Sequence, residues 1–341
     1  MIHQPIILIH GFNGSPSNWT GPADRFPDFL AARGYDPSLI RVFNYGEDKS
    51  GGKATYNSLG DIREIAHRLD GSDLSGPDLE NCSVDNLSKE SVAAGGPPKV
   101  TIIAHSSGGL VARYYLACSV PDSFGTRYRG NVDRVIFLGT PHQGVDVEDI
   151  LDPLPTNLLV YRLMVRLHYL FPPEYREQAE SLRKELGDLH RETKQLLAGE
   201  QAAREDTGET PAFKELHPHS PLLEQINRPG AMPRDIEYFN IVGDIRVRVQ
   251  IEVGGRHVFD HTKSLGDLLV TTASAGSIPN APSQCFQLVQ ERCLALDLSR
   301  NLSREVSLSE SGVQPLPVHR WLRSLPAARE RMLEILNRKR G

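Results

Sequence analysis

The sequence Val-Thr-Ile-Ile-Ala-His-Ser-Ser-Gly-Gly, which begins at residue 100, joins an apolar stretch to a small-x-Ser-x-Gly turn. The β-branched residues predict a buried strand over 100–104, and the apolar spacing after the turn predicts a helix over 108–118. A serine at such a turn sits in a sharp bend that exposes its hydroxyl above the sheet. Ala104 and Gly108 flank Ser106 and have to be small, because larger side chains would strike the adjacent backbone. We therefore predict that Ser106 is a nucleophile.

A second strand that ends in glycine lies near the N-terminus, in Pro-Ile-Ile-Leu-Ile-His-Gly-Phe at 5–12. Gly11 allows the chain to turn, so that the next amide faces a site beside the serine. We expect the backbone amides of Phe12 and Ser107 to form an oxyanion hole. His10 is interpreted as a support of this loop, with the catalytic base as its alternative role.

A serine of this kind is followed along the chain by an acid and then by a histidine. His319 is the only histidine after residue 261 and precedes a predicted C-terminal helix, so it is the candidate base. Asp267, in a Gly-Asp turn before an apolar stretch, is the favoured acid, and Asp244 and Asp260 are its rivals. Alternating apolar residues after Asp244 predict a further strand, which makes Asp244 a hairpin-turn residue. The acid would orient the imidazole and stabilise its charged form.

Several stretches resemble a bacterial lipase or esterase of the α/β-hydrolase superfamily, close to the true lipases whose turn is Ala-His-Ser-x-Gly-Gly. They are Leu-Ile-His-Gly-Phe at 8–12, Ala-His-Ser-Ser-Gly-Gly at 104–109, Leu-Gly-Thr-Pro-His-Gln-Gly at 138–144, His-Ser-Pro-Leu-Leu-Glu-Gln-Ile-Asn at 219–227 and Gly-Asp-Leu-Leu-Val at 266–270. The resemblance spans nearly the whole chain. It implies an α/β-hydrolase fold, with a mostly parallel central sheet flanked by helices and a helical lid or cap insertion. It also gives Ser106, Asp267 and His319 the roles of a catalytic triad.

The resemblance further implies a serine carboxylic-ester hydrolase, a lipase or esterase of lipid metabolism that forms an acyl-enzyme on Ser106. This chemistry requires no cofactor. The pattern of the zinc site of thermophilic lipases is not evident, and a structural calcium stays open. A thioesterase or a lipid-anchor deacylase with the same triad is the alternative function, and a non-catalytic interaction module is a third.

The resemblance implies a small-molecule or lipid ester as the partner, and composition bears on other classes of partner. The 341 residues carry a net charge of −5, which does not suggest nucleic acid. No apolar run is long enough for a transmembrane helix, and no secretory signal follows Met1, so we expect a cytoplasmic protein if Met1 is native and a secreted one if a signal peptide has been removed. For Cys82, Cys118, Cys285 and Cys293 we favour free thiols, with Cys118 buried and a bridge between Cys285 and Cys293 as the alternative.

Strands and helices alternate as a parallel sheet requires. Predicted strands cover 5–9, 39–44, 100–104, 133–138, 236–242, 246–253 and 284–290, and predicted helices cover 24–33, 58–70, 108–118 and 326–339. Residues 71–98, rich in Gly, Ser, Pro and Asp, are expected to form a surface loop. The predicted division is a core in two parts, 1–144 and 231–341, separated by an insertion at 145–230.

The insertion departs from this alternation. Residues 157–171 are mostly apolar, whereas 174–209 are densely charged around one leucine stripe, as in an exposed amphipathic helix. We expect these helices to cover the serine as a lid and to contact a lipid surface transiently, with a static cap or a dimerisation pair as alternatives. Arg162 and Arg166 are candidates to attract an anionic headgroup, or solvated residues of a helix face.

Overall fold

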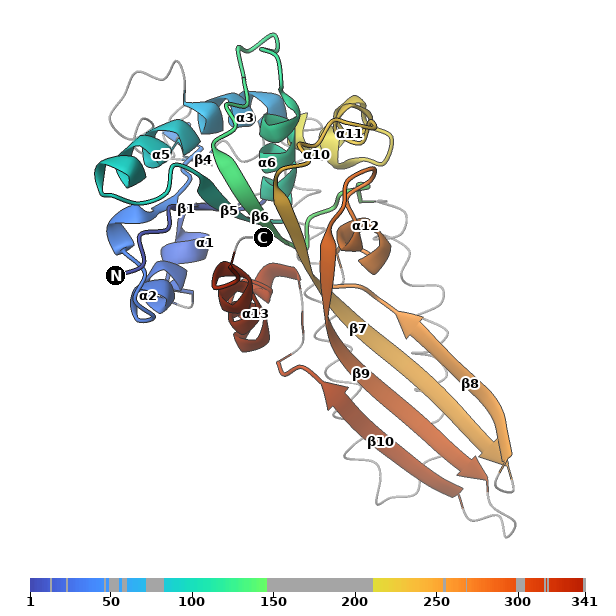
Figure 1. The fold of residues 1–341 in the computed structure, drawn as a ribbon. Helices are drawn as coiled ribbons and strands as arrows, with labels where there is room; N and C mark the ends of the chain where they lie inside the picture. Colours follow the sequence, from blue (N-terminus) through green and yellow to red (C-terminus); the bar gives the residue numbers. More distant parts are fainter. Residues whose placement is uncertain are drawn as a thin grey trace.

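The computed structural model describes residues 1–12, 14–22, 24–45, 47–48, 55–56, 60–71, 83–145, 211–253, 256–267, 269–298, 304–315, 317 and 319–339. These residues form an α/β fold built on one eight-stranded sheet (Figure 1). The predicted fold class, a mostly parallel sheet flanked by helices, is confirmed.

The strands follow the order β10-β9-β7-β6-β5-β1-β2, with β8 paired to β7. Their bounds are β1 (Ile6–Ile9), β2 (Ile40–Val42), β5 (Val100–His105), β6 (Val132–Leu138), β7 (Glu237–Val253), β8 (Arg256–Ser264), β9 (Gln284–Leu298) and β10 (Arg304–Gly312), and β3 (Glu47–Asp48) pairs separately with β4 (Thr55–Tyr56). Neighbours from β2 to β9 are parallel, whereas β8 and β10 run antiparallel to β7 and β9.

Helices cover both faces of the parallel part of this sheet (Figure 1). They are α1 (Ser17–Thr20), α2 (Phe26–Ala31), α3 (Ile62–Asp70), α5 (Val84–Ala93), α6 (Gly108–Ala117), α10 (Pro211–Leu216), α11 (Pro221–Ile226), α12 (Thr272–Gly276) and α13 (Pro326–Leu336), with short 3-10 turns η1 (Pro37–Leu39) and η3 (His319–Trp321). The cluster on one face takes residues from α3, α5, α6 and α11, and the cluster on the other takes them from α1, α2 and α13.

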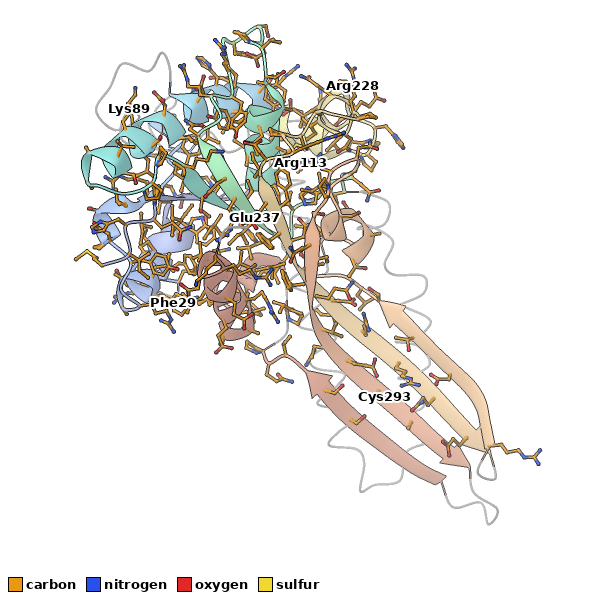
Figure 2. All side chains as sticks on the ribbon, viewed as in Figure 1. Phe29, Lys89, Arg113, Arg228, Glu237 and Cys293 are labelled. Atoms are coloured by element: carbon orange, nitrogen blue, oxygen red, sulfur yellow. The ribbon has the colours of Figure 1, made fainter. Side chains whose placement is uncertain are left out.

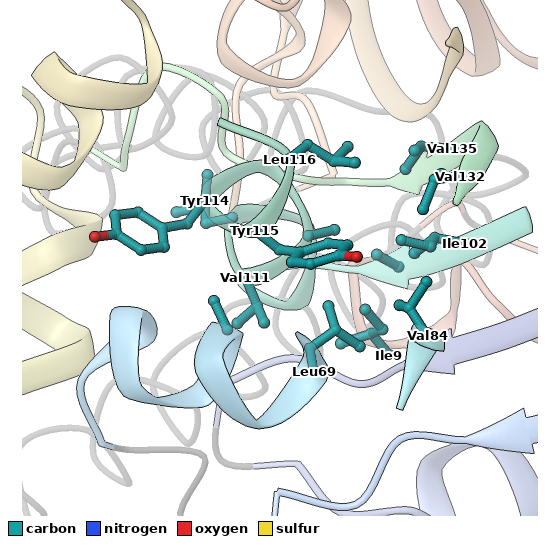
Figure 3. Packing of buried hydrophobic residues seen from close by; sticks show 14 of the residues in the cluster. Ile9, Leu69, Val84, Ile102, Val111, Tyr114, Tyr115, Leu116, Val132 and Val135 are labelled. Atoms are coloured by element: carbon teal, nitrogen blue, oxygen red, sulfur yellow. The ribbon is translucent and has the colours of Figure 1, made fainter. Parts of the chain in front are cut away.

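Alternation along β1 explains how one strand serves both clusters. Ile7 and Ile9 belong to the α6 side, whereas Ile6 and Leu8 belong to the α13 side, because successive side chains of a strand point to opposite faces. Figure 3 shows the α6 side, where Tyr115 and its neighbours pack onto the sheet. Each fully buried large apolar side chain there stabilises the fold by roughly 1.5–3 kcal/mol. This packing fixes the position of α6 on β5, and with it the position of the turn between the two.

The predicted break at Asp244 is wrong. The sequence predicts two strands, 236–242 and 246–253, but β7 runs unbroken through Asp244 and pairs with β9 along its length. The buried Asp244 carboxylate accepts hydrogen bonds from Arg246 Nε at 2.6 Å and from Ser264 Oγ at 2.6 Å. A polar side chain with such partners is tolerated inside a strand, so no turn is needed.

The outer halves of β7 and β9, flanked by β8 and β10, project from the helical layers as an arm (Figure 1). Asp260 lies on this arm, with Arg248 Nη2 2.5 Å from its Oδ2. Arg248 also lies 3.8 Å from Glu291 Oε1 on β9. Cys293 marks the arm in Figure 2, and its thiol donates to Gln250 Oε1 at 3.3 Å. The arm was not predicted, since β8 and β10 were missed and β9 is longer than its predicted range of 284–290.

The cysteines Cys118, Cys285 and Cys293 are free thiols, and Cys118 is buried as expected. Cys285 and Cys293 lie on the same extended strand, so at about 3.3 Å per residue their Cα atoms are roughly 26 Å apart. A disulfide requires Cα atoms within about 7 Å, which rules out a bridge between them on β9. Cys82 lies outside the described residues.

The surface loop predicted over 71–98 is wrong in part, because α5 occupies 84–93. Ser83 caps the helix by accepting a hydrogen bond from Asn86 N at 3.2 Å, and Val84 and Leu87 bury the inner face. The cap and this helical spacing were visible in the sequence, within a stretch dominated by polar residues. Residues 72–82 lie outside the described part of the chain.

Most of the predicted insertion, 146–210, together with Arg162 and Arg166, also lies outside the described residues, so a lid stays a prediction. The two ends of this segment are adjacent, since Val145 N donates to Leu216 O at 2.8 Å. Within the predicted range, α11 contributes buried residues to the core cluster on the α6 side.

Candidate active site

The turn between β5 and α6 holds Ser106 in a strained backbone conformation. Its φ is +57°, in the left-handed region that costs a non-glycine residue about 1–3 kcal/mol and is found mainly at functional sites. Ser106 N donates to Leu138 O at 2.9 Å, which ties the turn to β6. A Cβ added to Gly108 would lie 2.2 Å from His10 O, so this position does have to be small.

The imidazole of His319 lies directly against this serine. His319 Nε2 is 2.8 Å from Ser106 Oγ, and His319 Nδ1 is 2.7 Å from Asp267 Oδ2. The carboxylate only accepts, so Nδ1 carries the proton, and Nε2 of the neutral ring is free to accept from the serine hydroxyl. All three side chains are buried, and the structure thus brings together the three residues that the sequence selected.

The backbone around Asp267 fixes its carboxylate. Asp267 Oδ1 accepts from the amides of Leu269 at 3.1 Å and Val270 at 2.8 Å, which leaves Oδ2 directed at the imidazole. The rival acids are engaged elsewhere: Asp244 bonds to Arg246 and Ser264 within the sheet, and Asp260 bonds to Arg248 on the arm.

The loop after β1 also lies against the serine. A Cβ added to Gly11 would be 2.6 Å from Ser106 Cβ and 3.2 Å from Ser106 Oγ, so only glycine leaves room there. Phe12 follows this glycine, and Ser107 stands at the N-terminus of α6. The candidate oxyanion residues therefore flank Ser106 on two separate elements.

His10 supports this loop from behind. It is fully buried, stacks on Tyr45 with ring centroids 4.0 Å apart, and donates from Nδ1 to Gly11 O at 3.2 Å. The Tyr45 hydroxyl donates to the His10 carbonyl. Burial lowers the pKa of His10 to about 4, so the ring is neutral near pH 7. These contacts fit the supporting role better than the role of a base.

The model of the Alpha/beta hydrolase family matches residues 6–257. The chain belongs to this family. The matched range includes Ser106 and ends before Asp267 and His319, so the family match covers the candidate nucleophile but neither His319, which contacts it, nor Asp267, which contacts His319.

Solved structures similar to this α/β-hydrolase chain include three bacterial lipases. Lipase 1 from Pelosinus fermentans has a TM-score of 0.45 and 14% identity over 100% of both chains. The lipase from Staphylococcus hyicus has a TM-score of 0.42 and 16% identity over 84% of this chain and 87% of that one. For the mature lipase BlEst2 from Bacillus licheniformis the values are 0.39 and 15%, over 83% of each chain. A search of curated proteins found no match.

Three buried residues of this α/β hydrolase were not singled out from the sequence, and two of them, His105 and Gly139, lie at the site. His105 Nε2 bonds to the backbone carbonyl of His319 at 2.9 Å. Gly139, with φ +56°, lies so close to the acid that an added Cβ would be 2.7 Å from Asp267 Oδ2. Arg113, labelled in Figure 2, is buried and donates to Ile226 O at 2.9 Å, so it ties α6 to the end of α11. Only the small size of Gly139 and its place at the end of a predicted strand gave a signal.

Among the residues that the structure describes, no group of three His, Cys, Asp or Glu side chains could hold a metal ion. In the same part of the chain, no helix has the length and apolar character needed to cross a bilayer.

Proposed function

We propose that this chain is a serine hydrolase of carboxylic esters, a lipase or esterase. The proposal is carried by one observation, the continuous hydrogen-bond series from Ser106 Oγ through His319 to Asp267. Such a series is the arrangement that makes a neutral hydroxyl nucleophilic near pH 7.

In the proposed reaction, Ser106 Oγ attacks the ester carbonyl carbon while His319 Nε2 takes the hydroxyl proton. The charged imidazole is stabilised by Asp267, and its proton then passes to the leaving alcohol, which leaves an acyl-enzyme. Water then attacks the acyl carbon while His319 Nε2 takes a proton from it. The bond between the acyl carbon and Ser106 Oγ breaks, His319 gives the proton back to Oγ, and the carboxylic acid product departs.

The negative charge that develops on the carbonyl oxygen needs donors already in place. We assign this role to the backbone amides of Phe12 and Ser107, because a Cβ added to Gly11 would lie 2.6 Å from Ser106 Cβ and Ser107 is the N-cap of the following helix. Removal of one such donor typically costs 10²- to 10³-fold in kcat.

For substrates we propose acyl esters of medium or longer chain. The support is the apolar sequence of residues 157–171, which belong to a segment whose ends, Val145 and Leu216, are hydrogen-bonded to each other. This segment is also the proposed contact with a lipid surface. Turnover of p-nitrophenyl esters of increasing chain length tests the proposal, and turnover of acetate alone would refute the preference for longer chains.

Labelling with a fluorophosphonate tests the nucleophile, since this reagent reacts with activated serines. We expect one adduct by intact mass on the wild type, none on Ser106→Ala, and an unchanged adduct on the control Ser119→Ala, an exposed serine after α6. We expect kcat of Ser106→Ala to fall about 10⁶-fold. An unlabelled wild type would instead favour a non-catalytic interaction module. Faster turnover of thioesters than of the matched oxoesters would favour a thioesterase or lipid-anchor deacylase.

A further inference from the structure

His105 directly precedes Ser106 in the chain, and its side chain contacts the backbone of His319. Its Nε2 lies 2.9 Å from the carbonyl oxygen of His319, and the two rings are 4.9 Å apart between centroids. A carbonyl only accepts, so His105 is the donor and carries its proton on Nε2. His105 is buried, and burial, with the nearby His319 and Arg323, holds its pKa well below the usual value.

This contact closes a small ring of interactions around the serine. The ring runs from Ser106 Oγ to His319 Nε2, then from the His319 carbonyl to His105 Nε2, and back through the peptide bond that joins His105 to Ser106. The distance between nucleophile and base is thereby set by two adjacent residues, although Ser106 and His319 are 213 positions apart in the chain.

Within the described part of the chain, two other backbone hydrogen bonds hold the His319 backbone. Its N–H donates to Asp267 O at 3.0 Å, and its carbonyl accepts a longer bond of 3.3 Å from Leu322 N inside the same short turn. The contact from His105 is the shortest of these three and the one that joins the His319 backbone to the turn between β5 and α6. A neutral donor also suits this place, because a second charge beside His319 would oppose the imidazolium that forms during the reaction.

We propose that His105 is a positioning residue, whose Nε2–H holds the His319 backbone so that the imidazole stays within hydrogen-bond distance of Ser106. This inference rests on the proposed hydrolase function. His105 touches neither substrate nor the reacting atoms. It acts on the rate through the placement of the base, so it affects the chemical step and leaves ester binding nearly unchanged.

The test compares His105→Met, which keeps length without a donor, with His105→Gln, whose amide N–H reaches to a similar position. We expect kcat of His105→Met to fall about 10- to 100-fold, because small misplacements of catalytic groups have effects of this size. KM should stay within about threefold, and His105→Gln should regain most of the lost kcat. The control is His142→Met, which removes another buried neutral histidine, hydrogen-bonded to Asn240 at 2.9 Å, and should lower the thermal midpoint with wild-type kcat.

The outcomes separate this inference from the function on which it rests. A wild type that neither hydrolyses esters nor reacts with a fluorophosphonate refutes the proposed function. An active wild type with wild-type kcat in folded His105→Met refutes the positioning role alone. Equal loss of kcat in His105→Met and His105→Gln, with equally lowered thermal midpoints, would show a merely structural residue and also overturn the inference.

Discussion

A methyl group at Gly139 should separate the acid from the base. An added Cβ would lie 2.7 Å from Asp267 Oδ2 and 3.1 Å from His319 Nδ1, the two atoms that form the hydrogen bond between acid and base. Ordinary contact begins near 3.4 Å, so the carboxylate oxygen has to move by about 0.7 Å. A displacement close to 1 Å costs about 10²-fold in rate, and complete loss of the acid about 10⁴-fold. We therefore expect kcat of Gly139→Ala to fall by 10²- to 10⁴-fold.

A suitable control variant carries the same positive-φ strain as Gly139→Ala but does not clash with a neighbouring atom. Gly139 has φ +56°, and alanine there is strained by about 1–2 kcal/mol in addition to the clash. Gly130 has φ +72° and nothing within 4 Å of an added Cβ, so Gly130→Ala carries the strain alone. Steady-state hydrolysis of a p-nitrophenyl ester and urea unfolding of both variants give the comparison. Wild-type kcat in folded Gly139→Ala would refute the reasoning, as would an equal loss of kcat in Gly130→Ala.

Three further predictions follow, one from the site and two from buried carboxylates elsewhere in the fold. Asp267→Asn should keep the fold and lower kcat about 10⁴-fold, and an ester assay that shows less than a tenfold loss would contradict the triad assignment. Burial raises the pKa of Glu215, which accepts from Ile62 N, to about 7. The folded state therefore holds an extra proton between about pH 4.5 and 7, and stability falls as pH rises through that window. Urea unfolding at pH 5 and 8 should show a smaller pH difference for Glu215→Gln than for the wild type, and an equal difference would exclude this group. Asp24 is buried and pairs with Arg323 and Arg329, each at 2.7 Å, so Asp24→Asn should lower the free energy of unfolding by about 3 kcal/mol. Glu334→Gln, at the exposed Arg331 pair, should cost less than about 1 kcal/mol in the same assay.

The site was more accessible to sequence reasoning than its surroundings. Ser106 was fixed by local structure, because strand, small residues and helix all lie within a short stretch. His319 followed from chain order, as the only histidine after residue 261. The roles of His105 and Gly139 were not visible, because each depends on a contact with a residue more than 100 positions away.

The error at Asp244 has a related cause. Gly243 and Asp244 interrupt an apolar pattern, and polar residues at such a point are typical of a turn. The strand continues because Ser264, on the returning strand, supplies a hydrogen bond to the carboxylate. Because β8 was not predicted, the local sequence pattern could not indicate that Ser264 would bond to Asp244. The missed helix α5 is different, since its cap at Ser83 was local and was outweighed by the polar composition around it.

The arm explains why two of the three site residues lie so late in the chain. The chain runs out along β7 and back along β8 before it reaches Asp267, and out along β9 and back along β10 before it reaches His319. At the base of the arm, Ile245 N donates to Gly266 O at 2.8 Å and Val313 N donates to Val289 O at 2.9 Å, which fixes where each returning strand ends. Side chains of a strand return to the same face every two residues. A slip of β8 or β10 by two residues would therefore move Asp267 or His319 by about 7 Å. Since the bond between Asp267 and His319 tolerates only a few tenths of an ångström, pairing along both hairpins has to be correct before acid and base can meet.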